Sequence, residues 1–256
     1  MNYFEHKQEN KKKARIHNEA MEKMYPNRIS NAVKDSVIYG VDAETPKPIH
    51  EGKPEIVFMN TDSVEALLAY GEAEGKKCVL NFASFRNPGG MFMEGSSAQE
   101  ESLCHQSFLY NVLRRFPDYY AWNEKNKNRG MYENRAIYTP GVVFAKGERS
   151  TICDVLTCAA PNFSAGKRYG SVPKSDNSAA LRSRIRFVLD IAETEHVDTF
   201  ITGAYGCGVF SQDASEVAEL FKMFIANTSI RTIVFAVPGN DKNAKAFSFY
   251  FGRHGK

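Results

Sequence analysis

A glycine loop and a pair of carboxylates stand close together in this sequence, and their combination suits proton-transfer chemistry beside a bound ligand. The loop Asn87-Pro88-Gly89-Gly90-Met91 is followed, after seven residues, by Gln99-Glu100-Glu101. The two glycines permit positive φ and carry no side chain, so a ligand can approach the main-chain N–H groups closely. The two carboxyl groups can then transfer protons to and from that ligand. This pattern predicts a catalytic or binding site.

Glu100 and Glu101 also have a purely structural interpretation. Acidic residues in the first turn of a helix complement its dipole, and an isolated Glu-Glu pair more often has that role. The glycine loop at this spacing favours catalysis or ligand binding instead. Repulsion and enclosure raise the pKa of one carboxyl group in such a pair, whereas the helix dipole opposes the rise. The sequence leaves open which effect is larger.

A second glycine loop spans residues 203–210 and reads Gly203-Ala204-Tyr205-Gly206-Cys207-Gly208-Val209-Phe210. Such a loop binds anions when its N–H groups and the start of the next helix point at one ligand. It is also compatible with an ordinary strand-to-helix turn, because a G-x-G fragment alone is weak evidence for a nucleotide site. Its position after a buried strand favours the anion site.

Alternating strands and helices must position both loops. Strand-like segments lie near residues 55–59, 78–83, 136–144, 151–158, 199–202 and 232–237, and helical segments near 62–75, 99–113, 177–195, 214–226 and the C-terminus. Repeated βα units of this kind predict a largely parallel sheet between two layers of helices. Ligands of such sheets bind beyond the carboxyl ends of the strands, which is where both glycine loops fall.

The first part of the chain differs in character from the rest. Residues 1–25 are polar with a helical pattern, and Pro46, Pro48 and Pro54 interrupt the segment before the first βα unit. We therefore predict an N-terminal helical accessory region over residues 1–54 and a catalytic domain over residues 55–256, folded as one structural unit.

The composition bounds the class of protein. A chain of 256 residues with 43% hydrophobic and 25% charged residues can bury one sizeable core. No run of about 18 apolar residues is present to span a bilayer, and residues 1–13 lack the apolar core of a signal peptide, so we expect a cytoplasmic protein. The five cysteines include no C-x-x-C pair, which argues against a disulfide framework and a zinc site. The net charge of +3 is too small to indicate nucleic-acid binding.

Several other features invite a functional interpretation and have a simpler one. Cys207 is a candidate nucleophile, but no histidine has a recognisable partnering motif, and small buried cysteines usually pack. Cys104-His105 suggests a metal ligand pair, yet neighbours on a helix point in different directions. The aromatic residues within 119–122 either stack on an adenine or pack at a helix end. The arginines within 182–186 are predicted on the exposed face of their helix.

The first loop and Gln99-Glu100-Glu101 together resemble the signature of poly(ADP-ribose) glycohydrolases, in particular the shorter bacterial-type family built on a macrodomain. The second loop is similar to the diphosphate-binding loop of that family, and residues 80–83 resemble the strand that leads into its catalytic loop. The resemblance covers the chain from residue 55 onward, and the N-terminal part is similar to a helical accessory region. It implies a three-layer α/β/α macrodomain with a mostly parallel mixed sheet and an N-terminal helical extension.

The resemblance implies hydrolysis of the ribose–ribose O-glycosidic bonds of poly(ADP-ribose), through an oxocarbenium-like transition state. It assigns acid–base catalysis to Glu101, binding of the ribose hydroxyls to Glu100 and support of the loop to Gln99. The diphosphate is expected on N–H groups of the second loop, and Phe210 is expected to pack on the distal ribose. The predicted diphosphate donors are Gly206, Cys207, Gly208 and Val209, together with the start of the following helix. No metal or organic cofactor is implied; the expected ligand is ADP-ribose or its polymer, with ADP-ribosylated protein as a further candidate partner.

The loop departs from the family pattern at two positions. The family has three consecutive glycines, and here Met91 follows Gly89 and Gly90. If the third position requires positive φ, methionine strains it by roughly 1 kcal/mol or more; if not, its side chain lines the site. Ser84 stands where relatives carry an asparagine for the distal ribose, which makes Asn87 a candidate substitute.

Two other functions use the same pocket. A non-catalytic macrodomain that binds ADP-ribose is favoured by Met91 and opposed by Glu100 and Glu101. A hydrolase for a single ADP-ribose on a protein, a nucleic acid or a small molecule is compatible with all the motifs.

Overall fold

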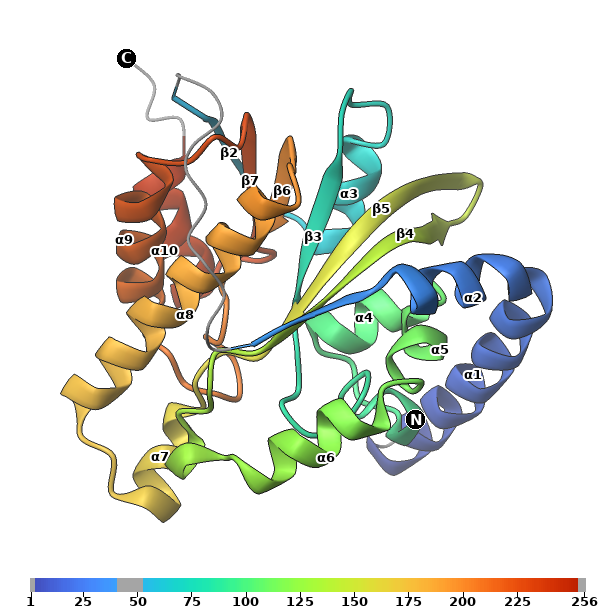
Figure 1. Ribbon diagram of the computed structural model, residues 1–256, viewed down its shortest axis with the longest axis horizontal. Coiled ribbons are helices and arrows are strands. Elements are labelled where there is room, and N and C mark those ends of the chain that lie inside the picture. The colour runs from blue at the N-terminus through green and yellow to red at the C-terminus, as the bar shows by residue number, and fades with distance from the viewer. Residues whose placement is uncertain (1–2, 41–52, 253–256) are drawn as a thin grey trace.

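A mixed β-sheet with helices on both faces forms the frame of the molecule (Figure 1). The computed structural model describes residues 3–40 and 53–252. The strands described are β1 (Val37–Tyr39), β2 (Glu55–Met59), β3 (Lys77–Phe82), β4 (Ala136–Lys146), β5 (Arg149–Cys158), β6 (Thr199–Thr202) and β7 (Thr232–Ala236). Their order in the sheet is β1-β4-β5-β3-β6-β7-β2. Strands β5, β3, β6, β7 and β2 run parallel, whereas β4 is antiparallel to both β1 and β5.

The helices form a layer on each side of this sheet. The α-helices described are α1 (Tyr3–Met24), α2 (Pro26–Asp35), α3 (Ser63–Ala69), α4 (Gln99–His105), α5 (Leu109–Leu113), α6 (Pro117–Lys125), α7 (Phe163–Gly170), α8 (Lys174–Thr194), α9 (Ala214–Ile225) and α10 (Lys242–Phe251). Short 3-10 turns are η1 (Phe92–Glu94) and η2 (Asn128–Gly130). Helices α8, α9 and α10 pack on one face, and α1 to α6 contribute the core of the other. This arrangement confirms the predicted three-layer α/β/α macrodomain fold.

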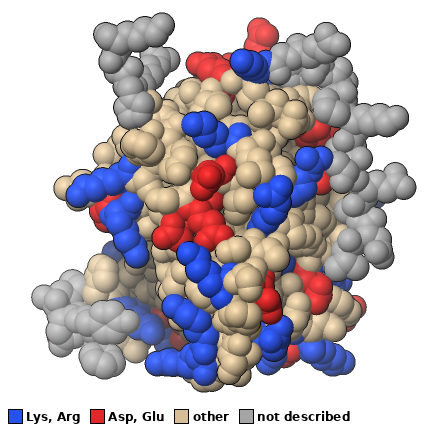
Figure 2. Space-filling view, turned by 90° about the vertical axis from the view of Figure 1, so that its left-hand side faces the viewer, with Lys and Arg blue, Asp and Glu red and all other residues tan. Residues whose placement is uncertain are grey.

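The face of the molecule over α8, α9 and α10 is strongly charged (Figure 2). Acidic side chains gather near its centre, and Lys and Arg surround them and continue to the lower edge. None of the helices within 3–40 and 53–252 is both long and apolar enough to cross a lipid bilayer.

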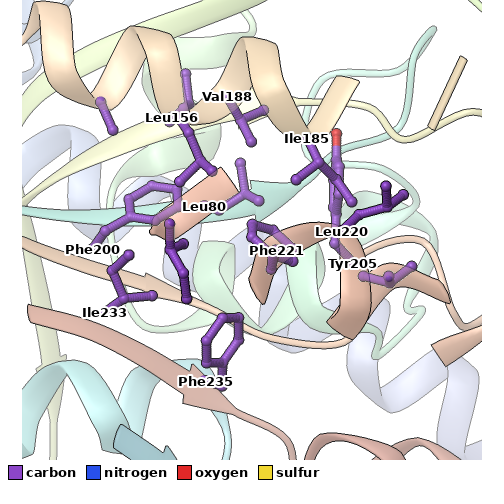
Figure 3. Close-up of a cluster of buried hydrophobic side chains, with 14 of the residues drawn as sticks. Leu80, Leu156, Ile185, Val188, Phe200, Tyr205, Leu220, Phe221, Ile233 and Phe235 are labelled. Carbon is purple, nitrogen blue, oxygen red and sulfur yellow. The ribbon is translucent and has the colours of Figure 1, made fainter. Parts of the chain in front are cut away.

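The alternation of side chains along the central strands builds two hydrophobic cores. In β3, Leu80 points to the helices α8 and α9, whereas its neighbour Val79 points to the opposite layer. Figure 3 shows side chains of β3, β5, β6 and β7 facing those of α8 and α9 on the first side. The apolar side chains of α8 that face the sheet are buried: Leu181, Ile185, Val188, Leu189 and Ala192. Burial of these side chains is the main stabilising contribution to the position of α8 on the sheet.

One arginine of α8 was expected on the exposed face and is instead buried. Arg184 is 1% exposed. Its guanidinium donates hydrogen bonds to the carbonyls of Ala159 and Glu133 and to Oδ1 of Asn134. The planar fork of donors is therefore satisfied inside the protein, which makes burial of the charge tolerable.

The helix predicted over 99–113 is interrupted between α4 and α5. Ser107 Oγ donates to the Leu103 carbonyl at 2.7 Å and accepts from the Leu109 N–H at 3.1 Å. The Gln106 carbonyl accepts from the N–H of Ala145 in β4. Local side-chain bonding and pairing with β4 thus replace a continuous helix at this point.

The N-terminal helices are joined to the main fold through a strand that was not predicted. Val37-Ile38-Tyr39 pairs with residues 136–138 of β4 as an edge strand of the sheet. Ala14, Ile29 and Ala32 belong to the same core as residues of α3, α4 and α5. Pro46 and Pro48 lie outside the described residues, and the division at residue 54 stays a prediction.

Candidate active site

The two glycine loops meet because they follow neighbouring parallel strands. Strands β3 and β6 pair directly, the first loop follows the end of β3 and the second follows the end of β6. A cavity of about 530 Å³ lies between them and is lined from both sides. Its lining includes Ser84, Gly90, Met91, Gln99, Glu100, Glu101, Ala160, Tyr205, Gly206, Gly208, Val209, Phe210, Pro238 and Asn243. The expected position of the ligand site beyond the carboxyl ends of the strands agrees with this cavity.

The first loop needs its two glycines and tolerates its methionine. Gly89 and Gly90 have φ of 65° and 62°, whereas Met91 has φ of −109°. A Cβ atom on Gly90 would lie 2.5 Å from Glu101 Oε1 and 2.9 Å from Glu100 Oε2. The third position therefore imposes no left-handed backbone, and Met91, which is 43% exposed, lines the cavity with its side chain.

Replacement of Gly90 by alanine is expected to lower the free energy of unfolding by about 2–4 kcal/mol, because it combines left-handed backbone with a clash. Gly147 is the matched control, since its φ of 63° is nearly the same and nothing lies within 4 Å of its added Cβ. Gly147→Ala should cost about 1 kcal/mol, from the backbone alone. Urea unfolding of both variants measures the difference. Equal losses would contradict tight packing of the carboxylates on Gly90.

Gln99 connects the start of α4 to the end of β3. Its Oε1 accepts the Phe82 N–H at 2.8 Å, and its Nε2 donates to the Leu80 carbonyl at 2.9 Å. The side-chain amide thus satisfies two main-chain groups of the strand and holds the helix beside it. This geometry supports the predicted role of Gln99 in holding the catalytic loop.

Glu100 is buried against the strand that precedes the loop. It is 3% exposed, and its two oxygens accept the Ser84 N–H at 2.6 Å and Asn81 Nδ2 at 3.2 Å. Burial raises the pKa of Glu100 to about 8, although these two donors act in the opposite direction. For Glu100, burial therefore outweighs the hydrogen bonds that favour its charged form.

Glu101 joins the glycine loop to the start of α4. Its Oε1 accepts the Met91 N–H at 2.8 Å, and its Oε2 accepts the Ala98 N–H at 3.0 Å. Ala98 is the N-cap residue, so the carboxylate satisfies one of the free N–H groups at the helix start. Glu101 lines the cavity beside Glu100, and the structure thus brings both predicted carboxylates together with the loop.

The second loop offers fewer donors than predicted. The Cys207 N–H already donates to the Ala204 carbonyl at 3.1 Å, and its buried side chain does not line the cavity. The N–H groups of Gly206, Gly208 and Val209 have no hydrogen-bond partner within the described residues. These three remain available to an anion.

The start of α9 was predicted to add hydrogen-bond donors to this loop, and it does not. Asp213 is its N-cap residue, and its carboxylate accepts the N–H groups of Ser215 and Glu216 at 3.0 Å each. An aspartate at the N-cap occupies the donors that would otherwise face a ligand.

Of the remaining predicted residues, Phe210 lines the cavity, whereas Gly89 and Asn87 do not. Phe210 lines the cavity, and its ring packs edge-on against Tyr132 at 6.2 Å between centroids. Gly89 lies behind the loop, where an added Cβ would be 2.8 Å from the Tyr110 ring. Asn87 is exposed and is not among the residues that line the cavity, so its contact with substrate stays a prediction.

Asn243 is a lining residue that the sequence analysis missed. It lies at the start of α10, shortly after the end of β7. Its buried Oδ1 has no hydrogen-bond partner within the described residues. The rule that ligands bind beyond strand ends also applies to β7, and it was the available signal for this residue.

The other candidates for chemistry have structural roles. Burial raises the pKa of the Cys207 thiol to about 12, which disfavours a thiolate nucleophile. His105 packs edge-on against Phe92 at 4.7 Å between centroids. Trp122 packs with the Arg135 guanidinium at 4.4 Å, away from the cavity. Within residues 3–40 and 53–252, no group of three or more His, Cys, Asp or Glu side chains is placed to hold a metal ion.

Comparison with known proteins places the chain in a family. The chain is similar to the crystal structure of poly(ADP-ribose) glycohydrolase from Thermomonospora curvata, with 26% identity and a TM-score of 0.84 over 95% of this chain and 100% of that one. A second structure of that enzyme, bound to the inhibitor ADP-HPD, matches at 26% identity over the same shares with a TM-score of 0.83. The poly(ADP-ribose) glycohydrolase from Deinococcus radiodurans in complex with ADP-ribose matches at 25% identity and a TM-score of 0.79, over 87% and 96% of the two chains.

A search of curated proteins found no match. A family model of the microbial-type poly(ADP-ribose) glycohydrolase (PARG) catalytic domain matches residues 4–147, which is more than half of the chain. The matched region includes the first glycine loop with Gln99, Glu100 and Glu101. The chain therefore belongs to the microbial-type poly(ADP-ribose) glycohydrolases, a family of hydrolases, by its catalytic domain.

Proposed function

We propose that this protein releases ADP-ribose from poly(ADP-ribose), with Glu101 as the acid–base group at the scissile ribose–ribose bond. The observation that carries the proposal is the position of the Glu101 carboxylate. It lies in the cavity between the two glycine loops and bonds to the main chain of the catalytic loop at Met91. The structure of the Deinococcus radiodurans enzyme with ADP-ribose supports the choice of ligand.

The carboxyl pair can supply one proton to the reaction. Because burial raises the pKa of Glu100 to about 8, Glu100 retains a proton beside Glu101 at neutral pH. In the first step Glu101 gives a proton to the leaving ribose oxygen as its bond to C1″ breaks. In the second step a water molecule adds to C1″ and returns a proton to Glu101.

The rest of the cavity positions the substrate. Glu100 accepts hydrogen bonds from ribose hydroxyls, and the free N–H groups of Gly206, Gly208 and Val209 bind the diphosphate. Phe210 packs on the distal ribose and holds it toward Glu101. Asn243, whose Oδ1 has no partner in the described residues, contacts the nucleotide in the cavity.

Met91 supported the alternative of a non-catalytic ADP-ribose reader only if it strained the loop. Its φ of −109° is unstrained, so this argument no longer favours the reader.

All five cysteines are free thiols, which supports the proposed cytoplasmic location, where thiols stay reduced.

The direct test is the release of free ADP-ribose by the purified protein, measured by chromatography. Two substrates are compared: poly(ADP-ribose) and a peptide that carries a single ADP-ribose. We expect release from the polymer and persistence of the last, protein-linked ADP-ribose. Release from the peptide alone would instead select a mono-ADP-ribosyl hydrolase, and binding of ADP-ribose without release from either substrate would select a reader.

A further inference from the structure

A second cavity lies beside the active-site cavity and has a different character. It has a volume of about 400 Å³. The side chains that give it its character are those of Arg86, Lys127, Arg129, Tyr132, Asn162 and Tyr169. Cations, aromatic rings and an amide are the groups that proteins use to bind a nucleotide with its phosphates.

The two cavities are immediate neighbours. Ser84 lines the first and Arg86 the second, and in the same way Ala160 lines the first and Asn162 the second. The rings of Phe210 and Tyr132 face the first and second cavity respectively and pack against each other edge-on. A thin wall of side chains therefore separates the distal-ribose end of the active site from the second cavity.

The second cavity carries an excess of positive charge. Arg86 and Lys127 share the carboxylate of Glu124, at 3.3 and 2.6 Å, and Arg129 pairs with Asp176 at 3.4 Å. These side chains are about half exposed, and such ion pairs hold weakly. Their cationic groups can therefore exchange these carboxylates for a phosphate at little cost in free energy.

Helix α7, which borders the cavity, adds to this charge. It carries Lys167 and Arg168, whose side chains pack over the rings of Phe163 and Tyr169 rather than in an ion pair with a described carboxylate. Lys and Arg side chains gather along the lower edge of the face in Figure 2, the edge where α7 lies in Figure 1. The surface around the cavity is thus suited to a polyanion.

The loop that forms one wall of this cavity is held in an unfavourable backbone conformation. Arg129 and Tyr132 have φ of 52° and 59°, which non-glycine residues rarely adopt. Each such residue costs on the order of 1 kcal/mol and persists where the surroundings demand it. Here the conformation stacks Tyr132 on Phe85, with 4.0 Å between ring centroids and 11° between planes.

We propose that this second cavity binds the ADP-ribose unit that adjoins the scissile bond on the leaving side of the polymer. The inference rests on the proposed function, because the leaving group begins at the distal ribose beside Phe210. Lys127 and Arg129 bind the pyrophosphate of that unit, and Tyr169, which is 81% exposed, offers its ring face to the adenine. The protein therefore recognises two consecutive units of the chain and favours the polymer over a single ADP-ribose.

The test compares variants on two substrates. The variants are Lys127→Glu/Arg129→Glu and Tyr169→Ser, and the control is Lys23→Glu/Lys34→Glu, which reverses two exposed charges on α1 and α2. The substrates are poly(ADP-ribose) and ADP-ribose with a small 4-nitrophenyl group at C1″. We expect Lys127→Glu/Arg129→Glu to lower kcat/KM on the polymer by roughly tenfold and to leave kcat/KM on the small substrate unchanged. It should also make kcat/KM on the polymer less dependent on salt concentration. Tyr169→Ser should lower the polymer value by roughly fivefold, and the control should change neither.

A binding measurement separates this inference from the proposed function. In a Glu101→Gln background, which removes turnover, the polymer should bind at least tenfold more tightly than free ADP-ribose. Lys127→Glu/Arg129→Glu should remove this tighter binding of the polymer without changing the affinity for ADP-ribose. Equal losses on polymer and small substrate, or an unchanged polymer value in both variants, would overturn the second subsite. Failure of the wild type to hydrolyse either substrate would count against the proposed function, whereas the binding comparison would still decide the subsite.

Discussion

Glu101→Gln is expected to lower the rate of ADP-ribose release from poly(ADP-ribose) by about 10³-fold or more. The change removes the group that gives a proton to the leaving oxygen and takes one from water, so both steps lose their catalyst. The amide keeps the volume of the carboxylate. It also keeps one acceptor for either the Met91 or the Ala98 N–H, the two donors that Glu101 binds. The measurement is single-turnover release of ADP-ribose at saturating enzyme, so that the chemical step is observed.

The control for this prediction is Glu94→Gln, in the same loop. Glu94 is about half exposed and pairs with Lys11 at 2.6 Å, away from the cavity. Its replacement should change the rate less than threefold, because an exposed ion pair contributes little. The Glu101 variant must bind ADP-ribose as the wild type does. A loss of rate no greater than that of Glu94→Gln would show that Glu101 is not the acid–base group.

Glu100→Gln is expected to stabilise the protein in a pH-dependent way while lowering activity. Burial raises the pKa of Glu100 from 4.5 to about 8, so the folded state binds a proton that the unfolded state has lost between these values. The contribution of this group to stability is therefore complete below pH 4.5 and is lost as the pH rises toward 8. A neutral glutamine avoids that loss, because nothing has to ionise in the buried site.

The expected gain from Glu100→Gln is on the order of 2–4 kcal/mol in the free energy of unfolding at pH 8, with little gain near pH 4.5. The amide oxygen can accept the Ser84 N–H, and the amide nitrogen can donate to Asn81 Oδ1, which has no partner within the described residues. Urea unfolding of both proteins at several pH values between 4.5 and 8 measures the gain. At the same time, loss of the carboxylate contact to ribose should reduce ADP-ribose release by roughly 10²-fold.

Glu94→Gln again serves as the control, and it should leave the free energy of unfolding almost unchanged at either pH, because an exposed ion pair contributes little. The comparison of each variant with the wild type at the same pH cancels the titration of all other groups. A gain from Glu100→Gln that is the same at pH 4.5 and pH 8 would mean that packing, and not the buried charge, causes it.

Features that depend on short stretches of chain were predicted well from the sequence. The largely apolar runs at residues 78–83 and 232–237 predicted the central strands β3 and β7. The helix predicted from residue 62 begins after Asp62, whose carboxylate accepts the N–H groups of Val64 and Glu65. Gly89 and Gly90 adopt the positive φ that their loop position suggested. Periodicity, capping and steric freedom act between residues that are close in sequence, so they can be recognised without the fold.

Other features depend on which distant segments pack together. Arg184 looked exposed by its place on a helix, but acceptors near residues 133 and 159 enclose it. The Cys207 N–H looked free and is bonded within its own loop. The strand at 37–39 is too short to be predicted, and it exists because β4 offers it an edge.

The sequence by itself predicted the fold class, the pair of carboxylates and the two loops that line the cavity. Only the tertiary structure decided that Met91 is unstrained, that Glu100 is buried enough to keep its proton, and that a basic second cavity adjoins the first. The physical reason is that backbone preferences are local, whereas desolvation and hydrogen-bond supply are set by atoms that the chain brings together from remote positions.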